Sequence, residues 1–319
     1  MDVRPIGSSG VTVSAIGLGG YQLGPEPGEI PDIDRGVDVI RAALDHGINW
    51  LDTSENYLDT RNETLIGEVL ARMDDEVIVA SKAAPRPGVT GGGSGFRREQ
   101  IHAACRASLR RLGRDHIDVY FLHWPDNSGV PLEETWGAMA ELADDGLVRA
   151  IGLSNYSADD VERCHAQRPL DAVQDGLSMI DYLDDRPAFA RYGELGIAVT
   201  IFEPLASGVL SAKTVAQVRG AWTGAWEETD FYRKLADPEW EARCDSFVGR
   251  LRAVADRLGV TVAQLAIAWV LHQPGITAAI VGSRDGRHIA ENAGGADVRL
   301  EASMDELERL IPLGPNVAP

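Results

Sequence analysis

Eight short apolar runs, separated by longer amphipathic segments, are the feature that most restricts the fold of this chain. The runs are nearly continuous rather than alternating, which is typical of strands covered on both faces. The segments between them carry helical patterns with proline near the start and glycine at the end, as in residues 131–146. The runs are "SAIGLG" (14–19), "NWLD" (49–52), "VIVASK" (77–82), "IDVYFLH" (117–123), "AIGLS" (150–154), "AVQDG" (172–176), "AVTIF" (198–202) and "AAIVGS" (278–283).

Eight strand–helix units in 319 residues favour an α/β fold of the (β/α)8 type, the TIM barrel. We therefore predict a single barrel domain over residues 1–319. The alternative is a doubly wound open sheet, for which a glycine-rich dinucleotide fingerprint would be evidence. The nearest match is "GLGGYQLG" (17–24), but Gln22 stands where the third glycine is required.

The segment "RPIGSSGVTVS" precedes the first barrel strand and predicts a β-hairpin. Its "SSG" supplies the turn. We expect this N-terminal hairpin to cap one end of the barrel.

The chain is strongly acidic, with 49 acidic and 30 basic residues and a formal net charge of −19. Such a surface repels nucleic acid and anionic lipid, so neither is expected as a partner, and an anionic ligand would need a local basic cluster. The cysteines, Cys105, Cys164 and Cys244, have no metal-binding spacing, which predicts no metal site and favours a reducing cytoplasm. No secretory signal pattern or membrane-spanning run is found, and no pattern indicates the oligomeric state.

Ionisable residues stand where three neighbouring apolar runs stop. Asp52, Lys82 and His123 end the second, third and fourth runs, and Tyr57 follows Asp52 by five residues. Singly, each has a structural explanation: a turn or cap, a solvent-facing lysine, a hydrogen-bonded core histidine, a packing tyrosine. In a barrel, however, these strand ends lie side by side at the C-terminal face, where active sites occur. The four residues together therefore predict an active site.

The stretches that carry these residues, "INWLDTSENY", "VASK" and "YFLHWPD", resemble the Asp, Tyr, Lys and His motifs of the aldo-keto reductases. That family consists of NAD(P)-dependent barrel oxidoreductases, and the resemblance covers nearly the whole chain. It implies reduction of an aldehyde or ketone to an alcohol, or the reverse oxidation, with Tyr57 as acid/base. Lys82 would lower the pKa of Tyr57, Asp52 would keep Lys82 charged, and His123 would hydrogen-bond the substrate oxygen.

The resemblance also implies a nicotinamide cofactor. "IGLSNY" (151–156) and Gln174 resemble the carboxamide-binding positions, "FEPLASGVL" (202–210) the nicotinamide-stacking and pyrophosphate loop, and "IVGSRDGRHIAEN" (280–292) the adenosine-phosphate segment. NADP(H) is favoured over NAD(H) because arginines in the last segment can hold a 2′-phosphate. The implied cofactor residues are Ser154, Asn155, Gln174, Phe202, Leu205, Ser207, Gly208, Leu210, Gly282, Ser283, Arg284, His288, Glu291 and Asn292.

Three positions depart from the family pattern. Phe202 stands where Tyr or Trp is common, Glu203 where a small polar residue is common, and Leu58 where a glycine usually follows the tyrosine. A phenyl ring still offers a face for stacking. The loop around Leu58 is expected to take another shape. In the phosphate segment, Asp285 is close enough to compete for Arg284 and Arg287, in which case these would be ordinary surface charges.

Two other functions remain open from the sequence. One is a Schiff-base lyase of the aldolase type with Lys82 as nucleophile, and the other is a cofactor-binding regulatory subunit without significant turnover. The substrate and the direction of reaction are not readable. Tyr21, Trp50 and Trp124 are candidates for the pocket wall, and four aromatic residues of the stretch 221–234 either form an apolar lid or pack that loop onto the barrel: Trp222, Trp226, Phe231 and Tyr232.

Overall fold

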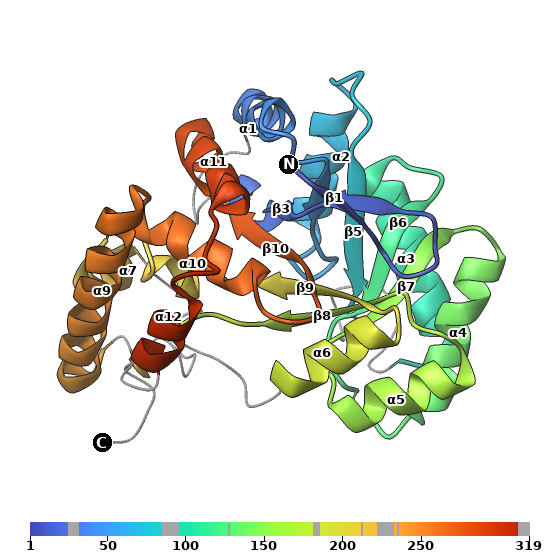
Figure 1. The fold of residues 1–319 in the computed structure, drawn as a ribbon. Coiled ribbons are helices and arrows are strands. Elements are labelled where there is room, and N and C mark those ends of the chain that lie inside the picture. The colour runs from blue at the N-terminus through green and yellow to red at the C-terminus, as the bar shows by residue number, and fades with distance from the viewer. Residues whose placement is uncertain are drawn as a thin grey trace.

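All eight predicted runs form strands, and these strands close into a barrel (Figure 1). Neighbours in the barrel are parallel, in the order β10-β3-β4-β5-β6-β7-β8-β9, so the predicted TIM barrel is confirmed. The computed structural model describes residues 1–24, 32–84, 96–126, 128–180, 186–211, 213–221, 233–234 and 236–311. The barrel strands are β3 (Ile16–Gly19), β4 (Trp50–Asp52), β5 (Ile78–Ala83), β6 (Ile117–Leu122), β7 (Val148–Ser154), β8 (Ala172–Gly176), β9 (Ala198–Phe202) and β10 (Ile276–Gly282).

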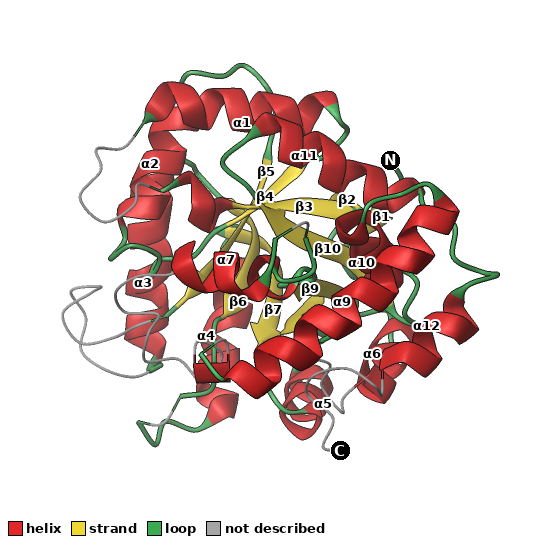
Figure 2. Cartoon of the chain, turned by 90° about the vertical axis from the view of Figure 1, so that its left-hand side faces the viewer, coloured by secondary structure: helices red, strands yellow, loops and turns green. Residues whose placement is uncertain are grey.

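Helices surround the strands, as Figure 2 shows. Polar residues set where several of them begin: the side chains of Asp32, Ser157 and Thr261 each accept a backbone N–H of the following first turn. The helices are α1 (Ile33–Asp45), α2 (Arg61–Leu70), α3 (Arg98–Leu112), α4 (Leu132–Asp144), α5 (Ala158–Gln167), α6 (Arg186–Glu194), α7 (Val215–Ala221), α9 (Pro238–Leu258), α10 (Val262–Leu271), α11 (Gly286–Ala293) and α12 (Met304–Leu310), with the 3-10 turns η1 (Gly20–Leu23), η2 (Ala206–Gly208) and η4 (Gly294–Asp297).

The predicted N-terminal hairpin is present. Strands β1 (Val3–Pro5) and β2 (Thr12–Ser14) pair antiparallel. The turn is fastened by the Ser9 hydroxyl, which donates to the Ile6 carbonyl at 2.6 Å. The Arg4 guanidinium donates to the carbonyl of Ile276, the first residue of β10, so the hairpin caps the N-terminal end of the barrel.

Beneath the hairpin lies a separate apolar cluster that includes Ile6, Val11, Val13 and Trp50. Trp50 is 2% exposed, and its indole N–H donates to the Ser14 carbonyl at 3.0 Å. Its assignment to the substrate pocket is therefore wrong: Trp50 fills the barrel interior at the end closed by the hairpin.

The larger apolar cluster fills the space between the strands and the surrounding helices. Within the described ranges, no single helix is long and apolar enough to cross a membrane, although α9 and α10, bent by 88° at their junction, pass that test as a pair. Most residues of α10 are buried, as in a helix that packs inside a protein core.

Candidate active site

Lys82 is the centre of a buried polar cluster at the C-terminal end of the barrel. It is 1% exposed, near the end of β5, and β5 lies beside β4, which ends at Asp52. Its Nζ donates to Asp52 Oδ1 at 2.5 Å and to the Thr53 carbonyl at 2.8 Å, and it lies 3.4 Å from the Tyr57 hydroxyl oxygen. The barrel thus brings together three of the four ionisable residues that the sequence pointed to.

Burial and neighbouring charges shift the pKa values of Tyr57 and Lys82. Burial raises the pKa of Tyr57 above its ordinary value of 10.0; Lys82 acts in the opposite direction, and Asp52 and Glu203 add to the rise. Lys82 thus lowers the Tyr57 pKa, as predicted, but burial has the larger effect. For Lys82, burial lowers the pKa, but Asp52 and Tyr57 outweigh burial and raise it. Lys82 is therefore a stable ammonium beside a protonated phenol.

His123 directly follows β6 and joins the cluster from the next strand. Its ring lies 5.8 Å from the Tyr57 ring, between centroids, with the planes at 72°. Its Nδ1 is 2.9 Å from the hydroxyl oxygen of Ser54, a fully buried residue between Asp52 and Tyr57. The backbone carbonyl of His123 accepts a hydrogen bond from Asn155 Nδ2 at 2.9 Å.

Two aromatic side chains predicted to contact substrate flank the cluster. The Tyr21 ring meets the Tyr57 ring edge to face, with centroids 5.2 Å apart. The Trp124 ring lies 4.2 Å from the His123 ring, tilted by 30°. Tyr21 and Trp124 therefore lie directly beside Tyr57 and His123.

The predicted carboxamide-binding residues lie next to the same cluster. Ser154 ends β7 and Gln174 lies in β8, and both are 1% exposed. Asn155 Nδ2 is 3.0 Å from Ser154 Oγ. Gln174 donates its amide to Asp52 Oδ2 at 2.8 Å, a contact that the sequence did not indicate. Asp52 is consequently held on both oxygens, by Lys82 and by Gln174.

The loop after β4 departs from ordinary backbone geometry, as its missing glycine suggested. Leu58, Asp59 and Thr60 have φ of 52°, 53° and 70°, in the left-handed region that residues other than glycine rarely enter. Leu58 occupies the space beside Gly24, where any Cβ would lie 2.0 Å from Leu58 Cδ1. The Tyr57 loop thus has a fixed, strained shape rather than the shape that a glycine would give.

The predicted stacking and pyrophosphate loop follows β9. Phe202 ends that strand, half-buried, beside Gly176, where an added Cβ would come 2.9 Å from the phenyl ring. Glu203 is exposed, has φ of 54° and accepts the Ser207 hydroxyl at 3.3 Å. Leu205, Ser207, Gly208 and Leu210 form the tight turn around η2.

The predicted adenosine-phosphate segment follows β10. Gly282 ends the strand, Ser283 is buried, and His288, Glu291 and Asn292 lie on α11.

Arg284 and Arg287 in this segment have different partners. The Arg284 guanidinium donates to the carbonyl of Gln22 at 3.0 Å, across the barrel seam between β10 and β3. Arg287 instead pairs with Asp285 at 2.6 Å and lowers the pKa of that carboxyl to about 2. The competition by Asp285 is confirmed for Arg287. Arg284 also donates to the Gly24 carbonyl at 3.4 Å.

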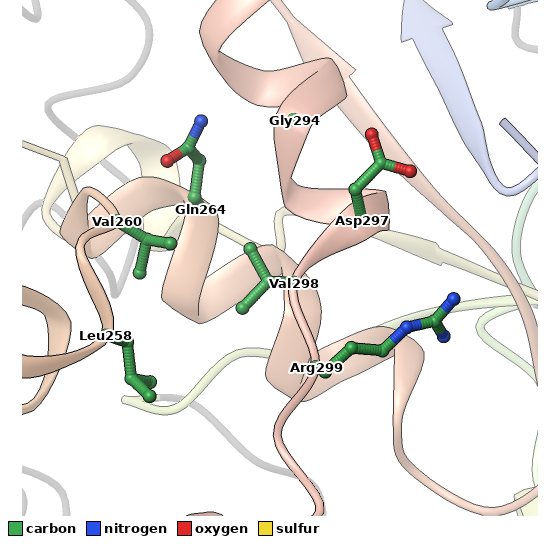
Figure 3. Close-up of a pocket in the computed structure, with 7 residues that line it drawn as sticks. All are labelled: Leu258, Val260, Gln264, Gly294, Asp297, Val298 and Arg299. Carbon is green, nitrogen blue, oxygen red and sulfur yellow. The ribbon is translucent and has the colours of Figure 1, made fainter.

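The structure leaves part of the predicted site undescribed. Trp222, Trp226, Phe231 and Tyr232 lie outside the described residues, so the lid stays a hypothesis. A surface hollow of about 350 Å³ beside η4 contains none of the predicted site residues (Figure 3). Among the residues that are described, no group of three or more His, Cys, Asp or Glu side chains is placed to hold a metal.

Sequence reasoning did not single out several residues that hold the cluster together. Ser54 contacts His123, the Thr53 carbonyl accepts from Lys82, and the Glu55 backbone N–H donates to the Lys82 carbonyl at 3.4 Å. All three lie in the stretch "LDTSENY". The available signal was a short polar run after a buried strand, but it does not say which side chain meets which neighbour.

A closed barrel with its ionisable groups gathered at the C-terminal end is the arrangement of a TIM-barrel enzyme. Residues 15–311 match the model of the aldo/keto reductase family, so the chain belongs to that family. The chain is 30% identical to "Probable aldo-keto reductase 1" of Glycine max over 98% of this chain and 90% of the relative. It is 29% identical to "Probable voltage-gated potassium channel subunit beta" of Arabidopsis thaliana over 99% of this chain and 98% of that relative. Family membership supports an oxidoreductase that uses a nicotinamide cofactor and a small carbonyl substrate.

Proposed function

We propose that this protein is a carbonyl reductase that uses NADPH and in which Tyr57 is the acid/base. The observation that carries the proposal is the buried Lys82 ammonium, bonded to Asp52 at 2.5 Å and 3.4 Å from the Tyr57 hydroxyl. Reduction of a carbonyl adds a hydride to carbon and a proton to oxygen. A bound dihydronicotinamide supplies the hydride.

The residues of the cluster divide the proton chemistry among them. Tyr57 remains a neutral phenol, because burial raises its pKa, and so it has a proton to donate as charge develops on the substrate oxygen. Lys82 stabilises the phenolate that is left. Asp52 compensates the buried ammonium, and Gln174 orients Asp52. In the reverse direction the phenolate takes the alcohol proton back.

The residues beside the cluster fit a dinucleotide. Asn155, Ser154 and Gln174 bring amide and hydroxyl groups to one side of the cluster, which suits a carboxamide with donors and acceptors of its own. Gly176 leaves room for the Phe202 ring, whose face can stack on a planar heterocycle. We assign these residues to the nicotinamide half, and the segment after β10 to the adenosine half.

The NADP preference rests on Arg284. A protein with a net charge of −19 must hold the 2′-phosphate with local cations, and Arg284 places a guanidinium in this segment, where it donates to the Gln22 carbonyl at 3.0 Å. Arg284→Ala should raise the KM for NADPH about 10- to 100-fold more than that for NADH. Arg287→Ala is the matched control, since its guanidinium is already bound to Asp285. Equal losses with both cofactors, or a wild type that prefers NADH, would contradict this assignment.

Tyr57→Phe tests the reaction itself. The substitution keeps the ring and removes the proton, so kcat for reduction of a panel of aldehydes should fall about 10²- to 10⁴-fold while NADPH binding changes little. Tyr120→Phe, at a wholly buried tyrosine of β6, is the control for loss of a phenol hydroxyl. A Tyr57→Phe enzyme that kept most of its kcat would exclude Tyr57 as the acid/base.

The rival lyase function requires a Lys82 amine of depressed basicity, but Asp52 raises the pKa of Lys82. The regulatory alternative is favoured by one observation, the similarity to a relative named as a potassium channel subunit beta. NADPH binding by the wild type without turnover of any aldehyde in the panel would support that alternative over the reductase.

A further inference from the structure

Ser54 is fixed between two polar partners at the edge of the cluster. It is fully buried, and its Oγ lies 2.6 Å from Asn56 Oδ1 and 2.9 Å from His123 Nδ1. Asn155 holds the His123 backbone carbonyl from the other side. These contacts fix the position of the His123 ring and place the Ser54 hydroxyl at its Nδ1.

The distances indicate where the hydrogens are. The Ser54 hydroxyl has one hydrogen and can donate it to only one partner. A separation of 2.6 Å from Asn56 Oδ1 suits an O–H···O bond, and 2.9 Å from His123 Nδ1 suits an N–H···O bond. The reverse arrangement would require the Asn56 amide to donate at 2.6 Å, which is short for a nitrogen donor. Ser54 therefore donates to Asn56 and accepts from Nδ1–H of His123.

We propose that Ser54 is a positioning residue that keeps Nδ1 of His123 protonated, so that only the imidazolium form of His123 donates to a substrate carbonyl. A neutral imidazole has one N–H. With that hydrogen on Nδ1, Nε2 is an acceptor and offers nothing to a carbonyl oxygen. The imidazolium form has a hydrogen on both nitrogens and can donate from Nε2. This inference rests on the proposed reductase function for its kinetic consequence alone.

Several ionisable groups around His123 also affect a pH profile. Tyr57 lies against the ring, Lys82 and Asp52 lie behind Tyr57, and Glu203, after β9, acts on Tyr57 through its charge. The test must therefore compare variants that retain all four of these groups.

The first experiment locates the hydrogen in the free protein, without substrate or turnover. Nitrogen-15 NMR of labelled histidine side chains is recorded against pH, and the His123 signals are assigned by their loss in His123→Asn. In the wild type Nδ1 should be protonated at every pH at which the protein is folded. In Ser54→Ala the neutral ring should shift its proton toward Nε2. A neutral wild-type ring with its proton on Nε2 would overturn the proposal.

The second experiment follows benzaldehyde reduction with NADPH as pH is varied. In Ser54→Ala the neutral His123 ring becomes free to donate from Nε2, so the ratio of kcat at about pH 8.5 to kcat at about pH 6 should rise about three- to tenfold. Asn56→Ala should raise the ratio too, because the Ser54 hydroxyl can then turn toward Nδ1. Ser81→Ala removes another buried hydroxyl, bonded to Glu63, and should leave the ratio unchanged.

The kinetic outcomes separate the two proposals. A Ser54→Ala profile that falls in scale with an unchanged ratio contradicts the role of Ser54, even if the wild type is a reductase. A wild type without turnover contradicts the reductase function, and the NMR result then decides the tautomer independently.

Discussion

The two ends of the barrel differ in which residue types adopt left-handed backbone geometry, with positive φ. At the N-terminal end, every described residue with positive φ in a helix-to-strand connection is a glycine, namely Gly47, Gly113, Gly146, Gly196 and Gly275. At the C-terminal end, seven such residues are not glycine, and all follow β4, β7 or β9: Leu58, Asp59, Thr60, Asn155, Glu203, Ala206 and Ser207. Glycine adopts this geometry at little cost, whereas other residues lose about 1–3 kcal/mol each.

The two ends of the barrel also differ in the side chains that they bury. The N-terminal end is closed by an apolar cluster under the hairpin, and its buried carboxylate, Asp118, has Arg114 and Arg149 at 3.1 Å each. The C-terminal end buries Lys82, Asp52 and Gln174 with one another. Strain and buried charge are concentrated where the proposed chemistry occurs, which is the expected distribution for a preorganised site on a stable scaffold.

Lys82→Met should have the largest effect at the C-terminal end. Loss of the ammonium removes the stabilisation of the Tyr57 phenolate, so kcat for carbonyl reduction at neutral pH should fall about 10²- to 10⁴-fold. It also leaves Asp52 buried without its cation, which should cost about 3–5 kcal/mol in the free energy of unfolding. Steady-state kinetics and urea unfolding measure the two losses separately.

The double variant Asp52→Asn with Lys82→Met serves as the control for that experiment. It removes the unpaired charge, so most of the stability should return while kcat stays low. Recovery of both would mean that Lys82 acts on folding and not on the reaction.

Ile6→Ala is the corresponding change at the N-terminal end. Ile6 is 1% exposed in the cluster beneath the hairpin, so the substitution should cost about 2–5 kcal/mol in the free energy of unfolding. The kcat of the folded enzyme should stay close to that of the wild type. Val3→Ala, at a residue 61% exposed on the same hairpin, is the control and should change neither quantity. A large fall in kcat with Ile6→Ala would show that the two ends are coupled.

Glu55 makes the C-terminal end sensitive to pH. It is fully buried, its Oε1 accepts the Ala84 N–H, and its Oε2 lies 3.8 Å from Arg111. Burial raises its pKa from 4.5 to about 7, with Glu63 adding to the rise and Arg111 opposing it.

Because the folded pKa is above the ordinary one, the stability that Glu55 contributes is lost as pH rises from about 4.5 to about 7. The gap between these values corresponds to about 3 kcal/mol. Glu55→Gln should therefore match the wild type near pH 4.5 and exceed it by up to about 3 kcal/mol near pH 8 in urea unfolding. Glu301→Gln, at an exposed acid, controls for loss of one charge. An equal difference at both pH values would contradict a buried, titrating Glu55.

Sequence patterns were sufficient for the barrel because parallel strands buried on both faces leave continuous apolar runs. Helix ends were harder to place. Helix α9, for example, begins at Pro238, where the Asp237 side chain accepts the Glu239 N–H. The capping residue and the proline at the first position were readable signals of that start.

The candidate site was predictable where it depends on strand ends and not where it depends on distances. The order of the barrel brings Asp52, Lys82 and His123 together once eight strands are assigned. By contrast, the bond from Gln174 to Asp52 joins residues 122 positions apart, and the rise in the Tyr57 pKa follows from the extent of burial. No local sequence pattern encodes a contact between such distant residues or the extent to which Tyr57 is buried.

Thr60→Gly should have the smallest effect and tests whether strain in the Tyr57 loop contributes to activity. Thr60 has φ of 70°, a strained geometry for a β-branched residue, and its side chain makes no capping hydrogen bond to α2. Glycine relieves that strain but adds freedom to the unfolded chain, so the net gain in stability should be at most about 1 kcal/mol.

Gly113→Ala, at φ of 64° with nothing within 4 Å of the new Cβ, is the reciprocal control and should lose about 1 kcal/mol without affecting kcat. If the strained loop positions the Tyr57 hydroxyl, Thr60→Gly should lower kcat while raising the melting temperature. Unchanged kcat in the more stable variant would show that the strain is only tolerated by the site.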